Sequence, residues 1–371
     1  MVELVLGIAI VLILAILLII FRIQTLMSIM KGSYNKRVGS SNSLQALLLL
    51  ISFIVGAVAF AWSYLEARED FLPKAVSVHG LKTDTLFWTT MIILVVAFTV
   101  TNIFLFYFTY KYQYREGKRG YFYPENHKLE VVWTIIPAIV MAILVYYGWK
   151  EWTAITKEEP KESEVIEVMG KQFAWQVRYP GKDNKLGASH FKLIDGTNEF
   201  GLNFNDSASF DDFMPREIRI PKGKPVLFKI RARDVIHSVY APHFRLKMDA
   251  VPGMPTKFWF IPTKTTQEMR DELGNPKFNY ELACAEICGR GHFAMRYVIV
   301  VEEPEDYEKW KKEQTSFAAA NADYVKERAP KELHSLIGGS TQEVEKAEAT
   351  ISATIPTDTT SISPVDSVSG N

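Results

Sequence analysis

Four long apolar runs, all within the first 150 residues, constrain the fold of this chain more than any other feature. They cover residues 2–21, 46–64, 86–110 and 131–150. Each run approaches the roughly 20 residues that an α-helix needs to cross about 30 Å of hydrocarbon. Surface helices of soluble proteins are rarely so uniformly apolar, because one face meets water. We therefore predict about four transmembrane helices in residues 1–152.

The first apolar run has a second interpretation, because a cleaved signal peptide also begins with an apolar segment. A signal peptide usually carries a positive charge at its start and small residues at its cleavage site. Here residues 1–3 carry only the negative charge of Glu3, and residues 20–24 read Ile-Phe-Arg-Ile-Gln. A retained helix is therefore favoured over a cleaved one.

Basic residues in the connecting loops predict the orientation of the helices. The first loop carries four basic residues and no acidic one, and the third carries five basic residues against two acidic ones. Since basic loops stay on the cytoplasmic side, we expect everything after Trp152 to lie in the periplasm of a multi-pass protein of the bacterial inner membrane. The whole chain has 42 basic and 42 acidic residues, so no basic surface for nucleic acid is indicated.

The sequence after the last apolar run has β character. Short segments rich in β-branched and aromatic residues are separated by turns with Pro and Gly. These segments are residues 165–169, 172–179, 217–220, 226–231, 257–261 and 296–301. They predict a small β-sandwich over residues 160–305. The polar stretch between Tyr179 and Pro215 is expected to be a long loop without an assigned function, whose phenylalanines could dock on the sheet or on a neighbour.

The end of the chain has two expected parts. Residues 306–337 are predicted to form a helical extension, and residues 338–371 are predicted to be a disordered tail. The tail has too few large apolar residues to offset the entropy lost on ordering. No Cys-x-x-Cys-His sequence occurs, so no covalently attached haem is expected on this chain.

A set of metal-binding side chains lies between residues 284 and 295. Cys284 and Cys288 are the only two cysteines of the chain, and His292 and Met295 follow them. A further imidazole, His237, lies upstream on what is predicted to be the end of a strand. Thiolates, imidazoles and a thioether are ligands for a soft or borderline metal.

Four interpretations of this set differ in how many ligands they use. One tetrahedral zinc uses the two thiolates and the two histidines, and leaves Met295 without a role. One blue copper uses a single thiolate, so one cysteine is left over. Two coppers that share both thiolates use every ligand. A Cys284–Cys288 disulfide or a pair of buried thiols uses no metal at all.

The ligand segment carries a resemblance to a known family. Its pattern Cys-x-Glu-x-Cys-Gly-x-x-His-x-x-Met resembles the binuclear copper (CuA) loop of subunit II of haem–copper cytochrome c oxidases. The upstream Asp-Val-Ile-His-Ser at residues 234–238 matches the first histidine ligand of that family, and the similarity runs from Glu125 to Glu303. The resemblance implies a cupredoxin-type Greek-key barrel behind the membrane helices.

The resemblance also implies a function. CuA would accept electrons from cytochrome c or a membrane-bound c-type haem donor and pass them to haem in subunit I, supporting oxygen reduction and proton translocation. The implied metal ligands are His237, Cys284, Glu286, Cys288, His292 and Met295. Glu286 would give its carbonyl to copper and its side chain to a magnesium or manganese ion at the interface; the alternative is a solvated acid.

Three residues outside the ligand set also receive roles from the resemblance. Glu130, at the start of the fourth apolar run, matches the mouth of a proton pathway into subunit I; the alternative is an acid at the membrane interface. Phe173 stands where the family often has the tryptophan through which electrons enter. Trp175 matches the second tryptophan of that block, or packs in the core. The change at Phe173 leaves the identity of the donor open.

Two other functions remain as alternatives: a copper-binding or assembly protein of the membrane, and a copper-free subunit like those of quinol oxidases. All the ligands are retained here, which argues against the copper-free subunit. Glu130 and the adjacent Trp-Thr-Ile-Ile-Pro sequence argue against the assembly protein.

Overall fold

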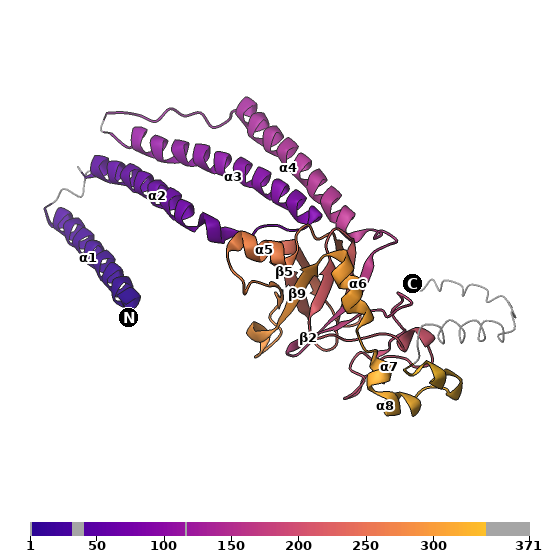
Figure 1. Cartoon of the computed structure of the whole chain (residues 1–371). Coiled ribbons are helices and arrows are strands. Elements are labelled where there is room, and N and C mark those ends of the chain that lie inside the picture. The colour runs from indigo at the N-terminus through magenta and orange to yellow at the C-terminus, as the bar shows by residue number, and fades with distance from the viewer. Residues whose placement is uncertain (1, 32–40, 116, 339–371) are drawn as a thin grey trace, which may run out of the picture. The chain divides into compact units, whose positions relative to one another are not determined.

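The computed structural model describes residues 2–31, 41–115 and 117–338 (Figure 1). It forms two compact units, which we describe separately. One comprises Met1–Leu72 and Trp88–Met141, and the other comprises Pro73–Phe87 and Ala142–Asn371. The predicted disordered tail falls almost wholly on residues 339–371, outside the described part of the chain.

Long helices account for the apolar runs. They are α1 (Val2–Met30), α2 (Asn42–Phe71), α3 (Val78–Lys111) and α4 (His127–Thr156). Among the described residues, three of them are long and apolar enough to cross a membrane, over Asn42–Arg68, Val78–Lys111 and His127–Thr156. These three predicted helices are confirmed. The apolar part found for α1, Val11–Met27, is shorter, and a fourth span stays a prediction.

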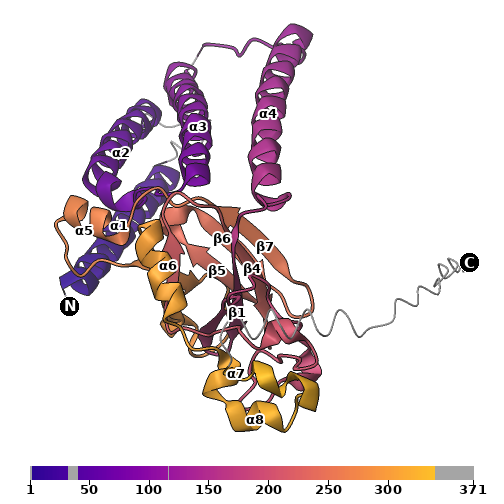
Figure 2. The same cartoon turned by 45° about the vertical axis from the view of Figure 1, so that its right-hand side comes forward.

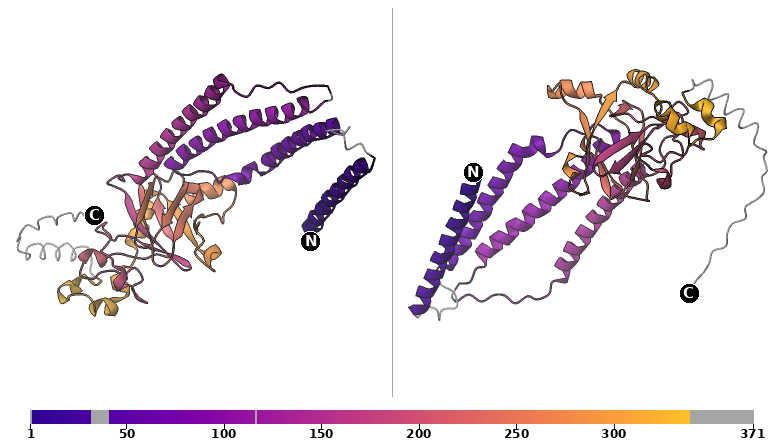
Figure 3. Two further views of the ribbon diagram at one scale, coloured as in Figure 1. Left: turned by 180° about the vertical axis from the view of Figure 1, so that it is seen from behind. Right: turned by 90° about the horizontal axis from the view of Figure 1, so that it is seen from below.

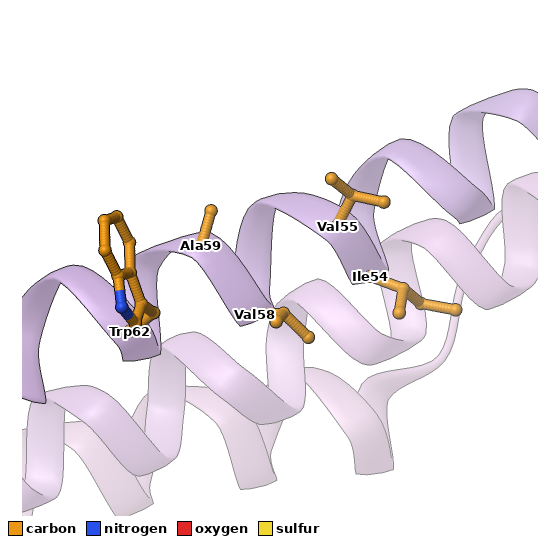
Figure 4. Close-up of a pocket in the computed structure, with 5 residues that line it drawn as sticks. All are labelled: Ile54, Val55, Val58, Ala59 and Trp62. Carbon is orange, nitrogen blue, oxygen red and sulfur yellow. The ribbon is translucent and has the colours of Figure 1, made fainter.

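An apolar recess on α2 is an example of the exposed apolar surface of these helices (Figure 4). It is lined by the side chains of Ile54, Val55, Val58, Ala59 and Trp62. Four of the five are more than half exposed, with values from 53% for Ile54 to 67% for Trp62. Such a surface is costly in water but is expected on a helix that faces hydrocarbon.

In the described part of the second unit, nine strands build a β-sandwich (Figure 2). One sheet has the order β2-β1-β4-β7 and the other β3-β9-β8-β5-β6. The strands are β1 (Glu164–Lys171), β2 (Ala174–Arg178), β3 (Ile218–Pro221), β4 (Val226–Ala232), β5 (His237–Ala241), β6 (Leu246–Ala250), β7 (Thr256–Phe260), β8 (Tyr280–Cys284) and β9 (Arg296–Glu302). Each of the six predicted β segments contains a strand, and the predicted β-rich domain is confirmed. Three strands, β5, β6 and β8, and the helix α5 (Thr266–Leu273) were not predicted.

The main hydrophobic core lies between the two sheets. Alternating residues of the strands point into it, as in Ile166 and Val168 of β1, which are both fully buried. Phe228, Phe244 and Phe260 lie in it, and the ring centroid of Phe260 is 5.3 Å from that of Phe228 and 5.0 Å from that of Phe244. Helix α6 (Pro304–Lys312) joins this core through the fully buried ring of Tyr307. The sandwich therefore gives a rigid support to the loops at its ends.

The segment between Tyr179 and Pro215 has no strand or α-helix, as expected of a loop, and it helps to form a second hydrophobic core. This segment and the end of the chain, α7 (Phe317–Ala320), α8 (Ala322–Lys326) and the 3₁₀-helix η6 (Lys331–Leu336), pack together (Figure 3). The buried members are Met169, Phe200, Leu202, Phe204, Phe210, Phe317, Ala318, Val325, Leu333 and Leu336. Met169 belongs to β1, so this core covers the outer face of that strand. Phe200, Phe204 and Phe210 of the segment are buried in this core, whereas Phe191 is 70% exposed and Phe213 belongs to the main core.

Candidate metal centre

Two free thiols form the middle of the site. Cys284 ends β8, and Cys288 lies in the loop that follows it. Their sulfur atoms are 4.0 Å apart. A disulfide requires about 2.05 Å between the sulfur atoms, so the structure contains two thiols and no bridge between them.

The other predicted donor atoms converge on these thiols from both sides. The Nδ1 atom of His237 lies 3.9 Å from Cys284 Sγ, and the carbonyl oxygen of Glu286 lies 3.2 Å from the same sulfur. The Nδ1 atom of His292 lies 3.6 Å from Cys288 Sγ, and Met295 Sδ lies 3.3 Å from it. Each sulfur therefore has one imidazole and one weaker donor beside it.

The β-sheet explains how residues 47 positions apart meet. His237 is the first residue of β5 and therefore lies at one end of a strand, and β5 pairs with β8 so that Val239 faces Cys284. The backbone N–H of Cys284 donates to Met295 O at 3.2 Å, which closes the loop between β8 and β9. The sheet thus fixes both ends of the ligand loop and the strand that carries His237.

Asp234 determines which ring nitrogen of His237 faces the thiols. Its Oδ1 atom lies 2.9 Å from His237 Nε2, which leaves Nδ1 on the side of the sulfur atoms. Its Oδ2 atom accepts the backbone N–H of Gln172 at 2.7 Å. Burial alone would raise the pKa of Asp234, but the hydrogen bonds from Gln172 and His237 hold this pKa below its ordinary value. Histidine ligands of metals usually have such a carboxylate partner.

The turn between β1 and β2 covers the ligand loop. Gln172 Nε2 donates to the carbonyl of Cys288 at 2.6 Å. The ring of Phe173 lies so close to two loop glycines that an added Cβ on Gly291 would lie 2.5 Å from Phe173 Cγ. Gly289 also has φ +132°, a conformation that other residues rarely adopt. Both glycines are needed for this close approach.

Burial has a strong effect on the chemistry of Cys288, which is 5% exposed. Burial first, and the neighbouring Cys284 second, raise the pKa of the Cys288 thiol to about 11. The metal-free thiol therefore carries a proton at neutral pH. A metal ion must displace this proton, so metal binding is expected to tighten as the pH rises.

The aromatic residues of the predicted electron path lie on one side of the site. Phe173 is 38% exposed, whereas Trp175 is 3% exposed and belongs to the main core. The rings of Trp175 and His237 meet edge to face, with centroids 5.9 Å apart. Trp175 therefore packs in the core and contacts a predicted ligand at the same time.

The carboxylates of two predicted site residues do not join the cluster of donor atoms. The side chain of Glu286 is exposed; only its carbonyl faces Cys284. Glu130 lies in the other unit, in the first turn of α4, with its carboxylate 3.2 Å from His127 Nδ1. Sequence reasoning missed Gln172, although its position directly before Phe173 in the family block could have pointed to it.

Comparisons with known proteins match both parts of the chain. Residues 164–303 match the family model "Cytochrome C oxidase subunit II, periplasmic domain", and residues 66–150 match the model of the transmembrane domain of the same subunit. The alternative cytochrome c oxidase subunit 2 of Bradyrhizobium diazoefficiens is 31% identical over 279 residues, which are 73% of this chain and 92% of that protein. The cytochrome c oxidase subunit 2 of Thermostichus vulcanus is 27% identical over 302 residues, covering 74% and 84% of the two chains.

Solved structures include similar proteins. The periplasmic domain of subunit II of cytochrome oxidase of Bradyrhizobium japonicum is 24% identical and covers 41% of this chain and 94% of that one, with a TM-score of 0.29. A chain of a heme-copper terminal oxidase dimer is 20% identical and covers 47% and 99%, also with a TM-score of 0.29.

Proposed function

Because this chain belongs to the cytochrome c oxidase subunit II family, we propose that it is the CuA-bearing subunit of a respiratory haem–copper oxidase. Its relatives are subunits of an oxidoreductase complex. In the proposed reaction a c-type haem donor, soluble or membrane-bound, gives electrons to the copper centre, which passes them to haem in subunit I. Oxygen reduction to water and proton translocation follow in the complex.

The convergence of six donor groups carries this proposal. The two thiols, the two Nδ1 atoms, the thioether and the Glu286 carbonyl are linked by distances of 3.2–4.0 Å. A single zinc ion has no use for Met295, and a single blue copper has no use for one of the thiols. Only a pair of coppers uses all of these groups, so the donor set fits CuA.

The protein contributes a rigid and dry environment. Bound copper would supply a carrier for one electron. His237 is fully buried, and Met295 and Cys288 are 1% and 5% exposed, so little water reaches these three donors, whereas Cys284 and His292 are partly exposed. The loop closure at Cys284 and the contact between Asp234 and His237 keep the donors in place, which keeps structural change during electron transfer small.

The approach of the donor is proposed to involve the exposed ring of Phe173. This ring contacts Gly289 and Gly291 of the ligand loop and remains 38% exposed. Trp175 beside His237 offers a second aromatic contact within the domain. Phenylalanine has no indole N–H, so the donor must be recognised without a hydrogen bond from residue 173.

Two acidic residues complete the proposal. Glu130 is proposed to admit protons at the cytoplasmic end of α4 into a pathway of subunit I. Glu286 is proposed to contribute to a magnesium or manganese site whose other ligands belong to another chain, since its side chain is exposed. We place the β domain in the periplasm and all four long helices in the inner membrane.

Replacing Met295 by leucine is expected to retain both coppers but to shift the reduction potential and slow electron transfer. A thioether is a weak axial ligand, so its loss changes the balance between oxidation states more than the binding of the metal. Copper content, potentiometric titration and stopped-flow reduction of the purified complex measure these effects. An unchanged potential with unchanged kinetics would show that Met295 is not a ligand.

Copurification tests the assignment to an oxidase complex. The chain, isolated from membranes under mild conditions with an affinity tag, is expected to bring a haem-bearing partner whose mass spectrum identifies an oxidase subunit I. Recovery of the copper-loaded chain without any haem-bearing partner would favour a copper-binding or assembly protein.

A further inference from the structure

We propose that Glu199, in the segment between Tyr179 and Pro215, is a positioning residue for the copper centre, an inference that rests on the function proposed above. One oxygen of its carboxylate, Oε2, contacts three side chains. These are the ammonium of Lys171, Gln176 Nε2 at 2.6 Å and Arg233 Nη1 at 3.2 Å. The three partners come from β1, from β2 and from the residue just after β4.

These three partners surround the turn that covers the ligand loop. Strands β2, β1 and β4 are neighbours in one sheet. Lys171 pairs with Ala174 across the β1–β2 hairpin, so only Gln172 and Phe173 lie in the turn between them. Glu199 therefore binds both strands of the hairpin beside this turn, together with the segment that leads from β4 toward His237.

Each held segment reaches the donor atoms through one further contact. Gln172, next to Lys171, donates to the carbonyl of Cys288. Asp234, next to Arg233, accepts the backbone N–H of Gln172 and lies 2.9 Å from His237 Nε2. The contacts that start at Glu199 thus end on two of the proposed ligands. One route ends on the backbone carbonyl of Cys288 and the other on the ring of His237.

Glu199 is itself fixed by a buried neighbour. The ring of Phe200 is 1% exposed and lies between two guanidinium groups, 5.7 Å from Arg178 and 5.4 Å from Arg231. Arg231 also donates to the carbonyl of Phe200 at 2.8 Å. The C-terminal residues Phe317 and Leu333 complete the core around Phe200. A residue anchored in this way can hold the turn, whereas one on a free loop could not.

Glu199→Gln is the variant that separates this role from folding, because it keeps the size of the side chain and removes its charge. Both coppers are expected to bind. Copper release to a chelator is expected to become about tenfold faster, the lower end of the effects seen when supporting partners of metal ligands are lost. The ratio of reduced to oxidised centre at a fixed solution potential is expected to rise about threefold, since a negative charge near the site is lost.

Two further variants locate the effect. Asp195→Asn removes a carboxylate from the same segment. The side-chain partners of Asp195 are Tyr324, which lies in α8, and Arg328, which follows α8. Since neither partner belongs to the turn that covers the ligand loop, the rate of copper release is expected to match that of the wild type. Lys171→Met combined with Glu199→Gln is expected to speed release no more than the stronger single variant, because the contact that Lys171→Met removes is one of those that Glu199→Gln already weakens.

The measurements use the full-length chain in detergent, loaded with copper, and begin with the wild type. A wild type that binds no copper pair would overturn the proposed function, and the inference with it. If the wild type binds a copper pair but Glu199→Gln has the same release rate and the same ratio of reduced to oxidised centre as the wild type, the inference alone is overturned. If the increases in copper release rate of the two single variants multiply in the double variant, Glu199 does not act through Lys171.

Discussion

Replacing Cys288 by serine is expected to abolish the binuclear copper centre. The Cys288 sulfur lies 4.0 Å from Cys284 Sγ, 3.6 Å from His292 Nδ1 and 3.3 Å from Met295 Sδ, so it is the donor that most of the others surround. A serine hydroxyl is a hard and weakly acidic group that does not replace a thiolate between two soft metal ions. Copper content should fall to one ion per chain or less, and the signal of a shared electron should disappear.

Met248→Leu provides the matched control for this experiment. Met248 is a partly buried thioether of β6 that packs against the main core. Its replacement changes a sulfur-containing side chain of the same domain and should leave the copper content unchanged. A Cys288→Ser protein that still holds a pair of coppers would mean that Cys288 does not bridge them.

The second large effect is expected for Arg178→Met, which should destabilise the β domain by about 3–5 kcal/mol. The guanidinium of Arg178 pairs with Glu167, and its Nη1 atom lies 2.8 Å from Asp212 Oδ2. Arg178 is 2% exposed, Glu167 6% and Asp212 fully buried. The variant leaves Asp212 without its arginine and the Gly187 carbonyl without the N–H of Arg178, while Glu167 keeps Arg231, whose Nε lies 2.6 Å from Glu167 Oε1. Thermal unfolding followed by tryptophan fluorescence measures the loss.

The loss of stability caused by Arg178→Met should depend on pH. Burial raises the pKa of Asp212 to about 8, although Arg178 counteracts this. The folded state therefore holds this proton more tightly than the unfolded chain does, so the carboxyl favours folding at low pH, and this contribution is lost as the pH rises through about 8. Removing Arg178 raises the folded-state pKa further, so the variant should lose stability more steeply than the wild type between pH 6 and pH 9.

Arg219→Met is the control for a pair of contacts near the surface. Arg219 also binds two carboxylates, Glu217 and Glu302, but its side chain is 30% exposed. Such pairs contribute about 1 kcal/mol or less, because water screens them. Equal losses for Arg178→Met and Arg219→Met would contradict the importance of burial in this network.

The cluster of donor atoms was predictable because most of it is local in the sequence. Four of the five side-chain donors lie within residues 284–295, and their types and spacing indicated a soft or borderline metal. The strands β1, β4 and β9 were predictable for a similar reason, since each shows the composition of a strand within its own few residues. Long apolar runs predicted the membrane helices, although α3 and α4 continue several residues beyond the hydrophobic part.

The support of the site was not predictable, because it depends on contacts between distant residues. Glu199 lies in a polar stretch with no regular pattern, and nothing local distinguishes it from neighbouring acids such as Asp195. Its role depends on the pairing of β1 with β4 and on Phe200 entering a core shared with C-terminal helices. The hydrogen bond from the Gln172 side chain to the carbonyl of Cys288 spans 116 residues and likewise has no sequence pattern.

The segment Pro73–Phe87 shows the same limit. It follows α2, yet it belongs to the β unit. The backbone N–H of Val76 donates to His243 O at 2.7 Å, and Thr263 N–H donates to Val76 O at 2.8 Å. Arg245 Nε also binds Asp84 at 2.6 Å. A domain beginning at residue 160 would lack these contacts, so experiments on the copper site should use the full chain.

Electron paramagnetic resonance of the full chain, loaded with copper and partly oxidised, distinguishes a copper pair from any other occupancy of the site. We expect a spectrum in which one unpaired electron is shared equally by two copper nuclei, with two coppers bound per chain. A spectrum of isolated single-copper sites at full loading, or no copper signal under any oxidising condition, would contradict this expectation.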